Sequence, residues 1–158
     1  MRKSEAIQEL ERLATESAQA KYPEIKPEWL APRTFKVNSA NSLTKAVIAY
    51  IQLNGGQAER ISNTGRMVNQ TKQFVDVMGF NRQVGSAKYI KGSGTRGTAD
   101  ISAVIRGNAV KIEIKWAKDR QSDVQKEYQK SIETAGGTYL IVRTFDEFYT
   151  WFNDYITI

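Results

Sequence analysis

Two short segments decide the fold: Gly97-Thr98-Ala99-Asp100-Ile101 and, after a Gly107-Asn108 turn, Lys111-Ile112-Glu113-Ile114-Lys115. If these segments pair as a hairpin, the Asp100 and Glu113 carboxylates and the Lys115 ammonium gather at one end of a sheet. Two carboxylates and an ammonium in that position suit a divalent metal held against a phosphate. Hydrolysis of a phosphodiester is therefore our leading hypothesis.

Alternation along the second strand separates its side chains into two sets. Successive side chains of a strand point to opposite faces, so Glu113 and Lys115 share one face while Ile112 and Ile114 anchor the core on the other. A solvated face laced with cross-strand ion pairs is the ordinary alternative for such a charged set. The Gly-rich loop before Asp100 and the polar run that follows Lys115 favour a cleft instead.

Composition limits the chemistry that the chain can perform. The 158 residues include neither cysteine nor histidine, which excludes disulfides, thiolate or imidazole zinc sites and nucleophiles activated by histidine. A net charge of +6 favours polyanionic partners, although many other proteins share it. No apolar run is long enough to span a bilayer, so we expect a soluble, intracellular, cytoplasmic protein without a membrane partner.

The order of expected elements indicates an α/β fold, with a mixed central sheet of about four strands flanked by helices. We expect one domain over residues 1–158. Tyr22–Asn38, which holds all three prolines, should be an extended connector anchored by Trp29, Leu30 and Phe35. The expected helices are Ser4–Lys21, Ser42–Leu53, Met67–Phe80, Ser122–Ala135 and one opened by a capping box at Thr144. The expected strands are Gln57–Ser62, Ile101–Arg106, Val110–Trp116 and Thr138–Val142, and Asn81–Thr98 should be a long loop.

The ordered set of motifs resembles a known nuclease family. The motifs are Gly97–Ile101, Ile112–Lys115, Ser122-Asp123-Val124-Gln125 and Ala135-Gly136-Gly137 before an apolar strand. Together with Ala58–Gly65, they are similar to the VRR-Nuc branch of the PD-(D/E)XK nuclease superfamily. The resemblance implies a restriction-endonuclease-like core over residues 41–158, with the helix and connector of residues 1–40 outside it.

The resemblance also implies roles for individual residues. Asp100 and Glu113 match the metal-binding carboxylates, with the Ile114 carbonyl as a third oxygen ligand for Mg²⁺ or Mn²⁺. Lys115 matches the lysine that orients water or stabilises the transition state, and Gln125 matches a catalytic glutamine on the following helix. From the residues alone, Ser122-x-x-Gln125 is equally a capping box. Ala99 replaces the proline found before the aspartate in many relatives.

One departure from the family concerns a third carboxylate. Many relatives carry an acidic residue on the helix before the first strand, but Ser42–Leu53 contains none. Glu59, Glu5 or Glu9 could substitute, and the sequence does not choose among them. This departure predicts either a site for one metal or a weak catalyst.

Basic and polar residues around the motif are expected to contact DNA phosphates rather than read bases, since no base-reading motif is recognisable. Any one of them could instead serve only solubility. The expected contacts are Arg60, Asn63, Lys88, Lys91, Arg96, Lys118 and Arg120.

The sequence thus predicts a metal-dependent endonuclease acting on DNA, with no small-molecule cofactor. Standalone relatives resemble Holliday-junction resolvases, which implies branched DNA as substrate and a homodimer, whose symmetry suits a four-way junction. A binding module that has lost efficient turnover is the second hypothesis. A structural protein with a coincidental motif is the third.

Overall fold

The computed structural model describes residues 3–62, 65–90, 92 and 94–157. By their contacts the residues fall into two compact units. We call residues 1–61 with 97–158 the sheet unit and residues 62–96 the ribbon unit, and each is described by itself. The expectation of a single domain over residues 1–158 stays a prediction.

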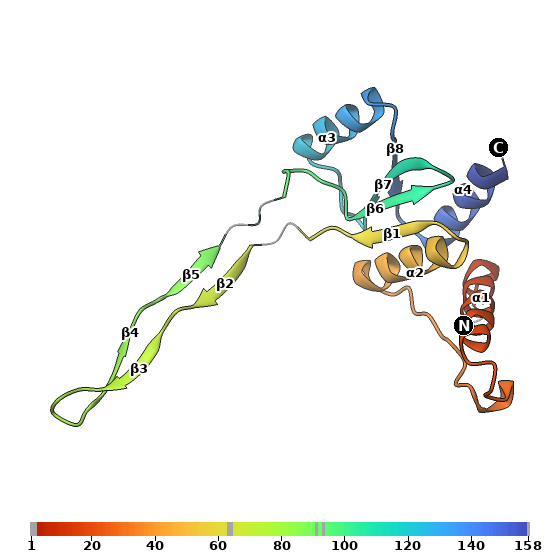
Figure 1. Ribbon diagram of the computed structural model, residues 1–158. Coiled ribbons are helices and arrows are strands. Elements are labelled where there is room, and N and C mark those ends of the chain that lie inside the picture. Colours follow the sequence, from red (N-terminus) through yellow and green to blue (C-terminus); the bar gives the residue numbers. More distant parts are fainter. Residues whose placement is uncertain (1–2, 63–64, 91, 93, 158) are drawn as a thin grey trace. The chain divides into compact units, whose positions relative to one another are not determined.

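The sheet unit is built on a mixed sheet, which has four strands among the described residues. Strand β1 (Gln57–Arg60) is antiparallel to β6 (Ile101–Ile105), and β6 is antiparallel to β7 (Asn108–Ile114). Strand β8 (Thr138–Val142) runs parallel to β7, and helix α3 (Asp123–Thr134) connects these two strands (Figure 1). The α/β class and the four-stranded mixed sheet flanked by helices are therefore confirmed. In sheet order the strands are β1, β6, β7 and β8.

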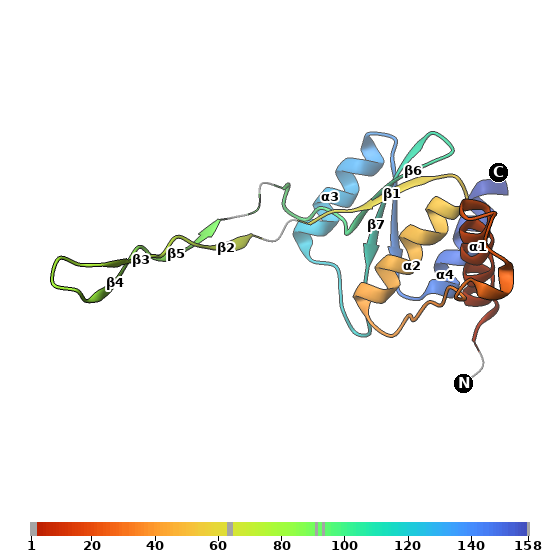
Figure 2. The same ribbon diagram turned by 60° about the horizontal axis from the view of Figure 1, so that its bottom comes forward.

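One face of the sheet is apolar and carries the core. Helix α2 (Ala40–Leu53) packs against β1, β6 and β7, while α1 (Glu5–Lys21) and α4 (Phe145–Thr157) pack against α2 and each other. Tyr50 lies at the centre of an aromatic cluster, with edge-on contacts to Phe145, Phe148 and Phe152. This burial holds the three helices on one side of the sheet (Figure 2).

The opposite face of the sheet is polar, and α3 covers it. The helical spacing of Val124, Tyr128, Ile132 and Ala135 predicts an inward stripe on α3. Tyr128 and Ile132 are half-buried, and Tyr128 contacts Tyr139 of β8 edge-on, whereas Val124 and Ala135 are exposed. The inward stripe is therefore confirmed at Tyr128 and Ile132 and wrong at the other two residues.

Local signals set most element boundaries. Ser39 and Ser42 form a capping box at the start of α2, and Thr144 and Glu147 form the expected one at the start of α4. The connector after α1 contains a turn at Tyr22–Ile25 and a short 3-10 turn, Pro27–Trp29, before it becomes extended. Trp29 is 72% exposed, so its expected role as an anchor is wrong. Within the described residues no helix is both long and apolar enough to cross a membrane.

The ribbon unit corrects two expectations. Met67–Phe80 is not a helix, and Asn81–Ile90 of the expected loop is not a loop, because these segments pair with each other as antiparallel strands. The turn between them begins at Asp76, whose carboxylate accepts hydrogen bonds from the Met78 and Phe80 amides. The strands are β2 (Arg66–Asn69), β3 (Lys72–Val75), β4 (Asn81–Val84) and β5 (Ala87–Ile90).

The central strand predicts how stability depends on the core. Ile112 is fully buried between neighbouring strands and α2. Ile112→Ala should lower the free energy of unfolding by about 2–5 kcal/mol, because it removes buried methyl groups and leaves a cavity. Val104→Ala, at a half-exposed position of β6, is the control and should change it by less than about 0.5 kcal/mol in urea unfolding. Equal losses would contradict this packing.

Candidate active site

The strand register brings Asp100 beside Glu113. Ile101 pairs with Ile112, so the residue before β6 lies next to the residue that follows Ile112. The Asp100 carboxylate accepts a hydrogen bond from the Ile114 amide at 2.9 Å, and its carbonyl accepts one from Ile61 at 2.8 Å. Asp100 is therefore fixed at the end of the hairpin by both its backbone and its side chain.

Gly97, in the segment leading to Asp100, fits where another residue would not. Its φ of +75° is one that side chains rarely adopt, and an added Cβ would lie 2.5 Å from the Val124 carbonyl oxygen in the first turn of α3. This close approach sets the distance between the start of α3 and the Asp100 segment.

Glu113, Lys115 and Gln125 form a closed triangle of contacts. The Lys115 ammonium lies 3.0 Å from Glu113 Oε1 and donates to Gln125 Oε1 at 3.0 Å. The Gln125 amide nitrogen donates back to Glu113 Oε1 at 2.6 Å. Glu113 and Lys115 are only 3% and 4% exposed, so the polar face of the sheet buries this pair rather than leaving it solvated.

Gln125 also caps α3. Its side-chain Oε1 accepts a hydrogen bond from the Ser122 backbone N–H at 2.9 Å, while its backbone N–H donates to Ser122 Oγ. The sequence left capping and a place in the site as alternatives, and the structure shows both contacts in one side chain. The cap therefore fixes the amide that lies between Glu113 and Lys115.

Burial and neighbouring charges shift the pKa of the Glu113 carboxyl. Loss of water raises the pKa of the Glu113 carboxyl above its ordinary value, and the nearby Asp100 charge raises it further, against the lowering effect of Lys115 and Gln125. Among the described residues, Glu113 Oε2 is buried without a hydrogen-bond partner. A buried carboxylate oxygen with no donor, close to a second carboxylate, fits a hard divalent cation.

The described residues contain no group of three or more acidic, histidine or cysteine side chains close enough to share a metal. The ligands expected from the sequence comprise two carboxylates, Asp100 and Glu113, with the Ile114 carbonyl as the third oxygen. Of the three candidates for a further carboxylate, Glu59 pairs with Ser102 and so lies on the same sheet face as Asp100. Glu5 and Glu9 belong to α1, which packs on the apolar side.

Two residues near the site were not assigned to it from the sequence. Asp119 lies 3.4 Å from the Lys115 ammonium, in the connection that follows β7. Tyr139 pairs with Lys111 across β7 and β8; burial raises its pKa to about 12, with a further contribution from Glu113. Only the parallel register of β8 places Tyr139 on this face, and the apolar pattern of Thr138–Val142 carries no such signal.

The residues expected to contact phosphate are divided between the two units. Arg60 hydrogen-bonds Asn41 of α2 and lies on the apolar side of the sheet, away from Asp100. Lys118 and Arg120 are exposed in the connection between Lys115 and α3. Exposed Arg96 and Lys88 belong to the ribbon unit, and Asn63 and Lys91 lie outside the described residues.

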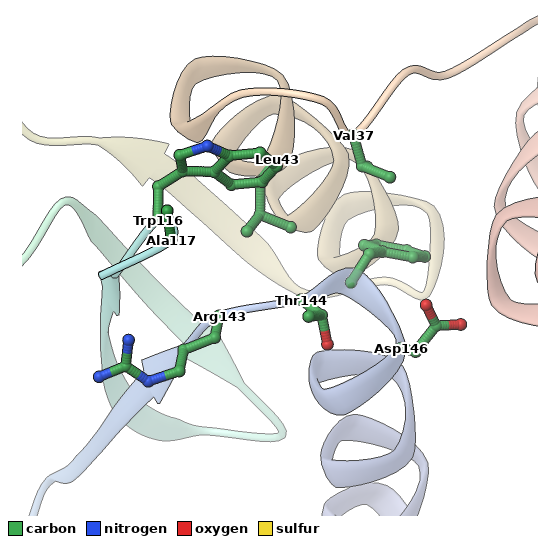
Figure 3. Close-up of a pocket in the computed structure, with 8 residues that line it drawn as sticks. Val37, Leu43, Trp116, Ala117, Arg143, Thr144 and Asp146 are labelled. Carbon is green, nitrogen blue, oxygen red and sulfur yellow. The ribbon is translucent and has the colours of Figure 1, made fainter. Parts of the chain in front are cut away.

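A hollow of about 410 Å³ lies at the end of β7 and β8, but it does not contain the carboxylates. Figure 3 shows Trp116 and Leu43 on one side of it, with Arg143 and Thr144 on the other. Most of its exposed lining is apolar, which suits neither a metal nor a phosphate. The candidate site is therefore the Asp100–Glu113–Lys115–Gln125 cluster and not this hollow.

Comparison with known proteins adds no assignment. No model of a protein family matches the chain, and no curated protein matches it significantly.

The buried Glu113–Lys115 pair predicts that substitutions at the two positions have non-additive effects on the free energy of unfolding. Lys115→Met should lower the free energy of unfolding by about 3–5 kcal/mol, because it leaves the Glu113 carboxylate buried without its cation. Adding Glu113→Gln should recover most of the loss, since the double variant buries no charge. Urea unfolding of wild type, both single variants and the double variant measures the coupling. Additive losses would show that the pair does not interact.

Proposed function

We propose that the chain is a metal-dependent nuclease that hydrolyses phosphodiester bonds of DNA. The observation that carries the proposal is the cluster in which Asp100 lies beside Glu113, Lys115 and Gln125 both contact Glu113, and Glu113 and Lys115 are buried. An ordinary solvated ion-pair face would leave such groups exposed. Perturbed carboxylates with a specific cation partner are typical of functional sites.

Each residue has a role in this proposal. Mg²⁺ or Mn²⁺ held by Asp100, Glu113 and the Ile114 carbonyl would neutralise charge on the phosphate and make a water molecule more acidic. Lys115 supplies a fixed ammonium that orients the attacking water or stabilises charge on the phosphoryl oxygens. Gln125 holds Lys115 and Glu113 in place, while its Oε1 also accepts the Ser122 N–H in the α3 cap.

The proposal extends to the fold family, the DNA substrate and the oligomeric state. The four-stranded mixed sheet and the position of the cluster at the end of its central hairpin support a restriction-endonuclease-like core of the PD-(D/E)XK type. A branched DNA substrate and a homodimer are part of the proposal, because a two-fold assembly suits two equivalent scissile strands.

A second function is favoured by one observation. Lys115 already neutralises Glu113, and the described residues provide no third acidic ligand. A nucleic-acid-binding module of the same fold with little or no turnover fits these two facts. Cleavage assays with both metals separate it from the nuclease.

The nuclease proposal predicts metal-dependent cleavage that requires both carboxylates. Wild type should cut labelled linear, flap, splayed or four-way DNA with Mg²⁺ or Mn²⁺ and not with EDTA. Asp100→Asn and Glu113→Gln should lower the rate by at least about 100-fold, because each removes a charged metal ligand. The same variants should still bind DNA in EDTA.

Asp123→Asn is the matched control, since it removes a fully exposed carboxylate from α3. It should leave cleavage unchanged. Calorimetric titration with Mn²⁺ gives a readout independent of activity: binding to wild type should be lost in Asp100→Asn. Full activity in Glu113→Gln would rule out the proposed mechanism, whereas DNA binding without product at either metal would favour the module.

The two sets of contacts that Gln125 makes predict that its effect on stability can be separated from its effect on the cleavage rate. Ser122→Ala removes the hydroxyl that accepts the Gln125 backbone N–H but leaves the side-chain amide between Glu113 and Lys115. Gln125→Ala removes that amide together with the Oε1 that accepts the Ser122 N–H. Each should lose about 1 kcal/mol of stability. Only Gln125→Ala should slow cleavage, by at least about tenfold, because the positions of Glu113 and Lys115 are released. Equal rates for the two variants would assign Gln125 to capping alone.

A further inference from the structure

The ribbon unit forms a two-stranded ribbon with one continuous register. Arg66 pairs with Ile90 at one end and Val75 with Asn81 at the other, and the intervening pairs are in step with no residue inserted. Between the two ladders, the Gln70 amide donates to the Ser86 carbonyl at 3.3 Å. The two strands run side by side for the length of the ribbon (Figure 2).

The charge of the chain is concentrated in this segment. Residues 62–96 contain six basic residues and one acidic residue, a net charge of +5 out of the total of +6. The acidic residue, Asp76, lies at the turn and is paired with Arg82 at 2.8 Å. Arg66, Lys72 and Lys88 are exposed, and within the described residues they form no ion pair.

The positive charges also share a face within each ladder. Residues paired directly across an antiparallel ladder project from the same face. The opposite face of each ladder has no charged residue among its paired positions. The charged face consists of four pairs that each join one basic and one apolar residue: Arg66 with Ile90, Lys88 with Val68, Lys72 with Val84 and Arg82 with Phe74.

A ribbon of this kind lacks a core of its own. Among the described residues of the unit none is buried, and an isolated two-stranded hairpin is marginally stable in water. The exposed apolar residues include Val77 and Met78 at the turn and Phe74 and Tyr89 on the strands. Such a surface is expected to gain a partner.

We propose that residues 66–90 bind duplex nucleic acid through this basic face. The major groove of B-DNA admits a two-stranded ribbon, and unpaired Lys and Arg side chains gain affinity by displacing counterions from phosphates. The apolar member of each pair would lie against sugars and base edges between the phosphate contacts. This inference rests on the proposed function for the choice of DNA as the polyanion.

Charge decides against a second copy of the chain as the partner of this face. Two ribbons joined through it would place Arg66, Lys72 and Lys88 of one copy against the same ammonium and guanidinium groups of the other. Like charges directly opposed are destabilising. A polyanion has the complementary charge along its whole length.

The test compares the salt dependence of binding. The ribbon variant is Arg66→Gln/Lys72→Gln/Lys88→Gln, and binding to a labelled duplex of about 20 base pairs is measured by fluorescence anisotropy in EDTA over a series of salt concentrations. The slope of log affinity against log salt should fall in magnitude by about two to three, since each phosphate contact contributes about one. The substituted side chains are exposed, so circular dichroism and thermal unfolding should match those of wild type.

The matched control removes the same charge from the sheet unit. Lys36→Gln/Lys45→Gln/Lys130→Gln changes three exposed lysines outside the candidate site. Its salt slope should stay within about one of the wild-type value. Equal slopes for the two triple variants would overturn the proposal, because net charge rather than the ribbon would then carry binding.

Two further readouts separate this inference from the proposed function. If wild type cleaves DNA while the ribbon variant keeps the wild-type salt slope, the ribbon inference fails and the nuclease stands. If no cleavage occurs but the slope depends on the ribbon, the nuclease fails and the inference stands. A dimer in sedimentation velocity that the ribbon variant breaks, with an unchanged slope, would instead make the ribbon a contact between copies and overturn the inference.

Discussion

The burial of Glu113 with Lys115 is the interaction on which the sheet unit's polar face depends. Desolvation raises the pKa of the Glu113 carboxyl, and the ammonium of Lys115 with the amide of Gln125 keeps the buried group compensated. Burying such a pair costs more free energy than burying apolar residues of the same size. Under the proposed function, the unpartnered Oε2 of Glu113 is the atom that would contact the metal.

This arrangement requires a sheet with two unlike faces. Isoleucines of β6 and β7 pack under α1, α2 and α4, and this apolar side holds the strands in place. The other side carries the polar groups, and α3 is attached there by the Gln125–Glu113 hydrogen bond, the Tyr128–Tyr139 ring contact and the close approach of Gly97 to Val124. The same strand alternation that anchors the core therefore supplies the site.

Sequence reasoning succeeded where the determining signals are local. Capping boxes, helical periodicity and the alternation of Lys111–Lys115 correctly placed the helices and strands of the sheet unit. It wrongly predicted a helix over Met67–Phe80, because the apolar residues of this segment recur at spacings that suit a helix as well as a strand. Pairing of that segment with Asn81–Ile90 decided the outcome, and such pairing is not readable from either segment alone.

The amino-acid sequence by itself determined that Asp100, Glu113 and Lys115 fall at the end of a hairpin, since alternation and turn chemistry act between near neighbours. Only the tertiary structure decided that Gln125 joins Glu113 to Lys115, that Arg60 lies on the other side of the sheet and that Tyr139 lies on the same face as Glu113. These relations depend on strand order, register and helix placement. They are set by which surfaces exclude water together, and residues far apart in the chain contribute to each of them.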